Sequence, residues 1–132
     1  MSPGDWVSYG CLDWGPALFH PDDTCLKEQM LAAGSVCQVA GEERDFWVLR
    51  FGPICVRRRK ELVGGAVVPP PPLVWGDRVR VKPPRTERSG VIRCIGWHFG
   101  RRQHLFWIEE DGRPVKARYF AAELAQVSAE PS

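Results

Sequence analysis

Aromatic and basic side chains follow each other closely in the run from Trp97 to Arg102, which reads Trp-His-Phe-Gly-Arg-Arg. Aromatic rings stack on flat ligands or hold cations, and guanidinium groups bind carboxylates and phosphates through paired hydrogen bonds. At a strand end, Trp97, His98, Phe99, Arg101 and Arg102 therefore predict a binding surface. The alternative is that the rings close a hydrophobic core and that His98 is an ordinary hydrogen-bonding residue.

Further basic residues alternate with apolar ones, which is the pattern of a strand with one face in solvent. The candidate binding residues of this kind are Arg78, Arg80, Lys116, Arg118, Arg57 and Arg59. A cationic face beside exposed rings is how small barrels bind nucleic acid. The chain's net charge of only +2 favours the simpler interpretation of solvated outer faces.

Charge is distributed unevenly along the 132 residues. Residues 1–34 contain one basic and five acidic side chains, whereas residues 63–132 contain eleven basic and seven acidic ones. Such a polar distribution, together with six Trp, favours a protein partner over nucleic acid. We rank nucleic acid second and an enzyme third.

Signatures of catalysis are missing from the sequence, which contains no nucleophile elbow, phosphate-binding loop, zinc-protease motif or dinucleotide fingerprint. The five cysteines form no C-x-x-C pair, and His20 with Cys25 lacks further metal ligands nearby. The first residues lack the basic start and the apolar run expected of a signal peptide, and no apolar run has the length of a membrane span. These features predict a cytoplasmic binding protein without cofactor or metal.

The candidate residues need strands to position them, and the segment 90–124 indicates three. Apolar alternation predicts strands over 91–97, 104–109 and 113–119, followed by a helical turn over 121–124. Asp111-Gly112 is a strong hairpin signal, because a type I′ turn needs positive φ at both central residues. Three such strands and a helical turn are typical of the sheet of an SH3-like barrel.

The first part of the chain predicts strands over 4–9, 36–40, 46–51 and 54–58, and one helix over 22–33. Pro21, Asp22 and Asp23 suit the start of that helix, and Gly34 suits its end. The segment 64–72 ends in four prolines and is interpreted as a stiff linker.

Four landmarks recur in the same order along the chain, which indicates an internal duplication. Gly4-Asp5 matches Gly76-Asp77, a shift of 72 residues; the segment 34–39 matches 90–95, a shift of 56; 46–48 matches 106–108, a shift of 60; and 61–62 matches 123–124, a shift of 62. We therefore predict a mainly β fold of two tandem SH3-like barrels: residues 1–68 with an inserted helix, a proline linker over 69–74, and residues 75–132.

The phrase G-V-I-x-x-I-x-W-H-F over 90–99, F-W-I over 106–108 and D-G-R-P-V-K-x-R-Y-F-x-x-E-L over 111–124 resembles a family of small uncharacterised bacterial proteins. H-P-D-D at 20–23 and G-D-x-V-x-V at 76–81 extend the resemblance. It implies the tandem small-barrel fold and a bacterial origin, but it brings no activity. The expected function is non-catalytic recognition of a protein partner, as a bacterial immunity or accessory protein would perform.

Overall fold

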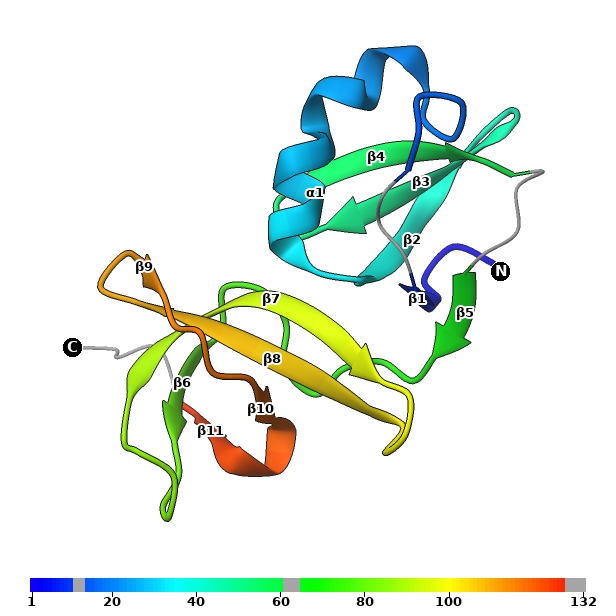
Figure 1. Ribbon diagram of the computed structural model, residues 1–132. Helices are drawn as coiled ribbons and strands as arrows, with labels where there is room; N and C mark the ends of the chain where they lie inside the picture. The colour runs from blue at the N-terminus through cyan, green and yellow to red at the C-terminus, as the bar shows by residue number, and fades with distance from the viewer. Residues whose placement is uncertain (11–13, 61–64, 128–132) are drawn as a thin grey trace. The chain divides into compact units, whose positions relative to one another are not determined.

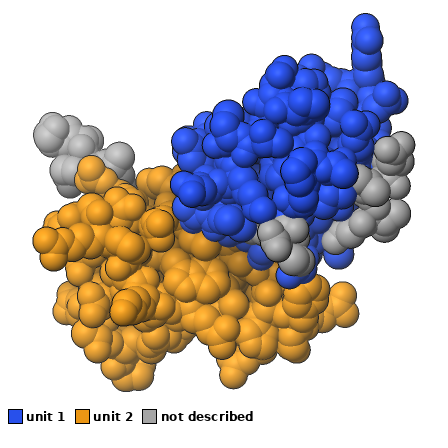
Figure 2. Space-filling model, turned by 45° about the horizontal axis from the view of Figure 1, so that its top comes forward, with its two compact units in different colours: residues 1–70 blue, residues 71–132 orange. Residues whose placement is uncertain are grey.

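The computed structural model describes residues 1–10, 14–60 and 65–127. The chain divides into two compact units, Met1–Pro70 and Pro71–Ser132, so that the division falls inside the proline run (Figure 2). Strands dominate both units, and the mainly β class predicted from the sequence is confirmed. Among the described residues, no helix has the length and apolar character needed to cross a membrane.

Unit 1 contains a five-stranded antiparallel sheet with the order β4-β3-β2-β1-β5. Its strands are β1 (Trp6–Tyr9), β2 (Val36–Glu43), β3 (Phe46–Phe51), β4 (Ile54–Arg59) and β5 (Gly65–Val68). Consecutive strands pair as a meander, and β5 returns to pair with β1. β5 lies within the segment interpreted as linker, so the first part of that segment belongs to the sheet.

The predicted helix of unit 1 consists of two parts, a 3-10 helix over Pro21–Leu26 and α1 over Lys27–Ala33. His20 caps the start by accepting the N–H of Asp22 at its Nδ1 atom, and Gly34 ends α1 with a φ of 103°. α1 crosses the sheet of unit 1 (Figure 1) and buries Met30 and Ala33. The apolar spacing expected from the sequence therefore marks the buried face of the helix.

Unit 2 contains a six-stranded sheet with the order β10-β8-β7-β6-β11, and β9 also pairs with β8. The strands are β6 (Arg78–Val81), β7 (Ser89–His98), β8 (Gln103–Glu110), β9 (Arg113–Pro114), β10 (Tyr119–Phe120) and β11 (Leu124–Gln126). A short 3-10 helix, η2 (Ala121–Glu123), precedes β11. The core of unit 2 contains buried side chains from its strands, among them Val79, Val81, Ile92, Ile95, Phe106, Ile108 and Tyr119.

The strand predicted over 113–119 is wrong in its centre. Only its ends pair with β8, as β9 and β10, and residues 115–118 belong to no strand. Pro114 lacks an N–H, so it interrupts the hydrogen bonds of a ladder. Val115 still donates to the carbonyl of Ile108 at 2.9 Å, and regular pairing resumes only at Tyr119.

The two units share a strand order and a turn at the start of their first strand. Gly4 and Gly76 have φ values of 94° and 90°, in the left-handed region that favours glycine. The carboxylates of Asp5 and Asp77 each accept the N–H of the third residue before them, at 2.8 Å in both cases. The match of Gly4-Asp5 with Gly76-Asp77, expected from the sequence, therefore extends to their hydrogen bonds.

The second strands also match, but in a different register from the one predicted. Val39 donates to the carbonyl of Asp5 at 2.8 Å, and Ile92 donates to that of Asp77 at 2.9 Å. Directly after these two residues, β2 and β7 each have a β-bulge. Val39 thus corresponds to Ile92 rather than Ile95, because apolar alternation does not distinguish registers when the preceding loops differ in length.

The closed barrels predicted from the sequence are not formed by these strand pairings. Each sheet has two edges, β4 and β5 in unit 1 and β10 and β11 in unit 2. In unit 1 the segment Leu18–His20 occupies the outer edge of β4, since Arg59 donates to Leu18 at 3.1 Å and His20 donates to Arg57 at 3.0 Å. In unit 2 the edge strands have only two and three residues, too few to pair across the opening.

Candidate functional site

A hollow of about 580 Å³ in unit 2 combines three arginines with an aromatic ring, and we call it the arginine groove. Its side chains come from four parts of the unit: the β6–β7 loop, the β7–β8 turn, the chain at β10, and η2. Its lining residues are Arg85, Arg101, Gln103, Arg118, Phe120, Ala122 and Glu123.

The β7–β8 turn fixes the backbone of Arg101. His98 and Gln103 close the hairpin as the last paired residues, and Arg102 adopts a positive φ of 53°. The Nδ1 atom of His98 accepts the N–H of Arg101 at 3.0 Å. His98 therefore positions this turn, and the hydrogen bond requires its Nδ1 to be unprotonated.

Phe120 forms an aromatic wall of the groove. The guanidinium carbon of Arg101 lies 5.0 Å from the centre of the Phe120 ring, and the imidazole of His98 lies 5.6 Å from it. Phe120 pairs with Leu105 in the sheet, whereas Tyr119 pairs with Phe106 and points into the core. The alternation of a strand thus holds Phe120 on the outer face.

Arg85 and Glu123 form the fixed side of the groove. Arg85 donates to Glu123 at 2.8 Å and to the carbonyl of Arg118 at 3.3 Å, and it lies 4.5 Å from the ring centre of Tyr119. Glu123 also accepts the N–H of Phe120 at 2.9 Å. That backbone hydrogen bond, and then the one from Arg85, lower the pKa of Glu123, while the hydrogen bond to Glu123 raises the pKa of Arg85.

Two guanidinium groups of the groove remain available to a ligand. Arg101 and Arg118 are exposed, and neither forms an ion pair with a carboxylate in the described part of the chain. The positive charge of Arg101 also lowers the pKa of Glu123, but less than the two hydrogen bonds and the charge of Arg85 do. Paired guanidinium groups beside an amide side chain form a binding site for anionic groups such as carboxylates or phosphates.

The comparison with known families gives one match. The model of the family of unknown function DUF6960 matches residues 1–125. The chain belongs to this family. No curated protein and no solved structure matches the chain.

In this DUF6960 protein, the aromatic residues of the predicted binding surface at 97–102 lie in different environments. Trp97 and His98 alternate across β7, so Trp97 contacts the buried His104 at 4.8 Å between ring centres, while His98 faces Phe120. Phe99 lies in the turn with 63% of its surface exposed. Of this run, His98 and Arg101 contribute to the arginine groove, and Phe99 and Arg102 are exposed beside it.

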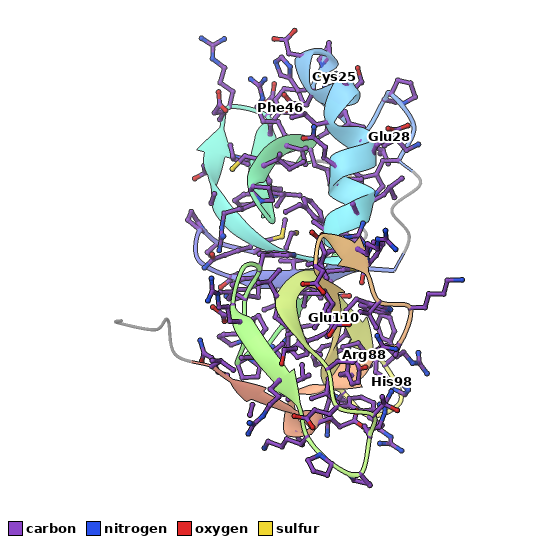
Figure 3. The ribbon with its side chains drawn as sticks, turned by 90° about the vertical axis from the view of Figure 1, so that its left-hand side faces the viewer. Cys25, Glu28, Phe46, Arg88, His98 and Glu110 are labelled. Atoms are coloured by element: carbon purple, nitrogen blue, oxygen red, sulfur yellow. The ribbon has the colours of Figure 1, made fainter. Side chains whose placement is uncertain are left out.

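The remaining predicted basic residues of unit 2 lie in two other places. Arg78 and Arg80 are exposed on β6 while Val79 and Val81 are buried, which confirms the predicted alternation. Lys116 lines a second hollow, together with Arg88, Glu110, Asp111, Arg113, Pro114, Val115 and Ala117. Arg88 and Glu110, which pair at 3.3 Å, are labelled in Figure 3 on the same unit as His98.

Arg57 and Arg59, the predicted binding residues of unit 1, have partners inside the unit. Arg57 donates to the buried carboxylate of Asp23 through its backbone N–H, Nε and Nη2 at 2.7, 2.9 and 2.9 Å. Arg59 donates to the carbonyl of Ala17 at 3.1 Å and lies 5.2 Å from the ring centre of Phe46. Both side chains hold elements of unit 1 together.

Unit 1 repeats the arrangement of His, Phe and Arg found at the arginine groove. His20 lies 4.9 Å from the ring centre of Phe46, with Arg59 over the same ring. The hollow beside them also contains Glu43, Arg44 and Asp45, so its charges are mixed. Among the described residues, no group of three potential metal-binding side chains occurs.

The sequence interpretation missed five residues of the groove: Arg85, Gln103, Phe120, Ala122 and Glu123. Arg85 lies in a loop, and Glu123 was assigned only to a helical turn. The motif R-Y-F at 118–120 contained the missing signal, because strand alternation places Arg118 and Phe120 on the same face.

Proposed function

We propose that this DUF6960 protein is a non-catalytic binding protein and that unit 2 recognises an acidic surface of a protein partner through the arginine groove. The observation that carries this proposal is the pair of exposed guanidinium groups, Arg101 and Arg118, beside an aromatic wall. Arginine and aromatic side chains dominate the energetic centres of protein interfaces.

The charge distribution of the two units supports an acidic partner. The sequence of unit 1 contains seven basic and nine acidic residues, and that of unit 2 contains eleven basic and seven acidic residues. In unit 1, Arg57 pairs with Asp23 and Lys60 with Glu42. In unit 2, the described carboxylates form no ion pair with Arg78, Arg80, Lys82, Arg101, Arg102, Arg113, Lys116 or Arg118.

Carboxylates near these cations favour a protein over nucleic acid. Glu123 lines the arginine groove, and Glu110 and Asp111 line the hollow beside Lys116. A continuous phosphate backbone would be repelled by such groups, whereas a protein surface offers spaced charges of both signs. His98 and Arg101 also cover the ring of Phe120, which reduces the area open to base stacking.

Single-stranded nucleic acid is the second candidate because of Phe99. This ring is exposed in the same turn as Arg101 and Arg102. A stacking ring beside cations is the arrangement that binds single strands without sequence preference.

We also propose an evolutionary origin of the two units and a biological context for the protein. Equal strand orders and matching turn hydrogen bonds support two units derived by internal duplication, each related to a partly open SH3-like barrel. The sequence phrases support a bacterial origin, and the lack of known catalytic motifs suits an immunity or accessory protein. A cytoplasmic location stays a prediction. Small barrels serve many functions, so the proposed activity depends on the groove rather than on the fold.

Fluorescence anisotropy tests the proposal with three labelled probes: an acidic Glu-rich peptide, a basic Lys-rich peptide of equal length and single-stranded DNA. We expect binding of the acidic peptide, and a loss of at least about tenfold in affinity when Arg101 and Arg118 are both changed to Glu. Arg44→Glu, an exposed charge reversal in unit 1, is the matched control and should change affinity less than about twofold.

The other outcomes are equally decisive. Preference for DNA over the acidic peptide would replace the protein partner with nucleic acid. Equal losses in the Arg44→Glu control and in the double variant would show that the groove has no particular role.

A further inference from the structure

The backbone between β9 and β10 has open hydrogen-bonding groups beside two hollows that contain more basic than acidic side chains. Among the described residues, the N–H groups of Lys116, Ala117 and Arg118 donate no hydrogen bond, and the carbonyls of Val115, Lys116 and Ala117 accept none. The groups belong to a surface segment, with Lys116 and Arg118 exposed and Ala117 half-buried. Such open groups at the edge of a sheet are a template for another strand.

This open edge is bounded on both sides along the chain. Before it, Val115 donates to Ile108, and β9 pairs with β8. After it, Arg85 covers the carbonyl of Arg118, and Glu123 accepts the N–H of Phe120. Backbone groups of a strand point alternately to its two edges, and Val115 and Tyr119 pair with β8, so the groups of Ala117 also face β8 while those of Lys116 and Arg118 face outward. An added strand would therefore pair with Lys116 and Arg118.

The two hollows lie along the same segment of chain. The first is lined by Arg113–Ala117 together with Arg88, Glu110 and Asp111, and there Arg88 pairs with Glu110. The second, the arginine groove, is lined by Arg118 and Phe120 together with Arg101. Successive residues of a strand alternate between faces, and residues on one face recur about every 6.8 Å. A strand laid on this edge would place acidic side chains next to Lys116 and Arg118 in turn.

We propose that an extended acidic segment of a protein partner adds as a strand to the outward backbone groups of Lys116 and Arg118, with carboxylates directed to the two hollows. This inference rests on the proposed function, because it specifies how the acidic partner is held. Main-chain hydrogen bonds supply affinity in this mode of recognition, and side-chain positions supply specificity.

The test uses a labelled peptide that alternates Glu and Val and a second peptide with the same side chains but N-methylated central amides. Both peptides have the same charge, but the methylated one cannot donate backbone hydrogen bonds to the edge. We expect the unmodified peptide to bind at least about tenfold more tightly, as the loss of one or two net hydrogen bonds predicts.

On the protein side, Lys116→Pro removes an outward N–H, while Lys116→Ala removes the same charge and keeps the N–H. The proline variant should bind the unmodified peptide about tenfold more weakly than the alanine variant does. If Lys116→Pro does not fold, the pair of peptides still decides the question.

Equal binding of the two peptides, or equal affinities of folded Lys116→Pro and Lys116→Ala variants, would overturn strand addition and leave the acidic partner in place. Failure of both peptides to bind would instead contradict the proposed function itself. Protection of the Lys116 and Arg118 amides from hydrogen exchange in the complex is the expected positive result.

Discussion

At the scale of single residues, Asp23 connects the helical segment of unit 1 to β4. Asp23 is only 6% exposed, and its carboxylate accepts three hydrogen bonds from Arg57. Asp23→Ala should lower the free energy of unfolding by about 2–3 kcal/mol, since it leaves the Arg57 guanidinium and its amide without their acceptor. Chemical denaturation measures this loss.

Asp22→Ala is the matched control, because Asp22 is a neighbouring carboxylate with 78% of its side chain exposed. Its loss should cost less than about 0.5 kcal/mol. Similar losses for the two variants would show that the contact between Asp23 and Arg57 adds no stability.

Asp23 also predicts how stability depends on pH. The hydrogen bond from the Arg57 side chain is the largest cause that lowers the pKa of Asp23 below its ordinary value of 3.8. A carboxylate with a lowered pKa contributes its stability above the ordinary value and loses it as the pH falls toward the folded pKa. The melting temperature of the original protein should therefore fall more steeply below about pH 4 than that of Asp23→Asn. Parallel curves in that range would contradict this contribution.

Residue types alone predicted part of the arginine groove. His98, Arg101 and Arg118 were identifiable because aromatic and basic residues adjoin in the sequence. Arg85 was not, since it reaches Glu123 from a loop 38 positions earlier, and no spacing rule connects the two. Arg57 was predicted as a binding residue, because the sequence does not show that the carboxylate of the buried Asp23 accepts its hydrogen bonds.

At the scale of elements, the approach of β7 to β8 requires a glycine at position 90. A Cβ atom there would lie 2.4 Å from the carbonyl oxygen of Glu109, which is backbone and does not rotate away. Gly90→Ala should lower the melting temperature by several degrees, because the two strands must separate or shift. Thermal unfolding followed by circular dichroism provides the measurement.

Gly41→Ala, in the equivalent strand β2 of unit 1, is the control, since a Cβ there meets no atom within 4 Å. Its melting temperature should stay the same or rise slightly. An unchanged value for Gly90→Ala as well would mean that β7 and β8 do not approach as closely as described.

Elements with strong local signals were predicted and those set by long-range pairing were not. Asp111 and Gly112 have φ values of 53° and 77°, which confirms the predicted hairpin turn between β8 and β9. In contrast, β5 was interpreted as part of a linker because its pairing with β1 joins residues about 60 positions apart. Alternation indicates a strand but does not identify its neighbour.

At the scale of the whole molecule, the proposed binding depends on an excess of positive charge in unit 2. Exposed charges more than about 8 Å apart are largely screened from each other at physiological ionic strength, and the screening grows as salt is added. The affinity for the acidic peptide should therefore fall as salt rises, and the Arg101→Glu/Arg118→Glu variant should show a smaller salt dependence than the original protein. Anisotropy titrations over a series of salt concentrations give both slopes, and equal slopes would indicate that the peptide binds elsewhere.

The central claim is that an acidic protein segment binds unit 2 at the arginine groove and the adjoining edge. Titration of the isotope-labelled protein with the alternating Glu and Val peptide, followed by amide NMR spectra, tests it most directly. The account predicts that the largest shifts occur at Arg101–Gln103 and Lys116–Phe120. Shifts confined to unit 1, or none at peptide concentrations that saturate the anisotropy signal, would contradict it.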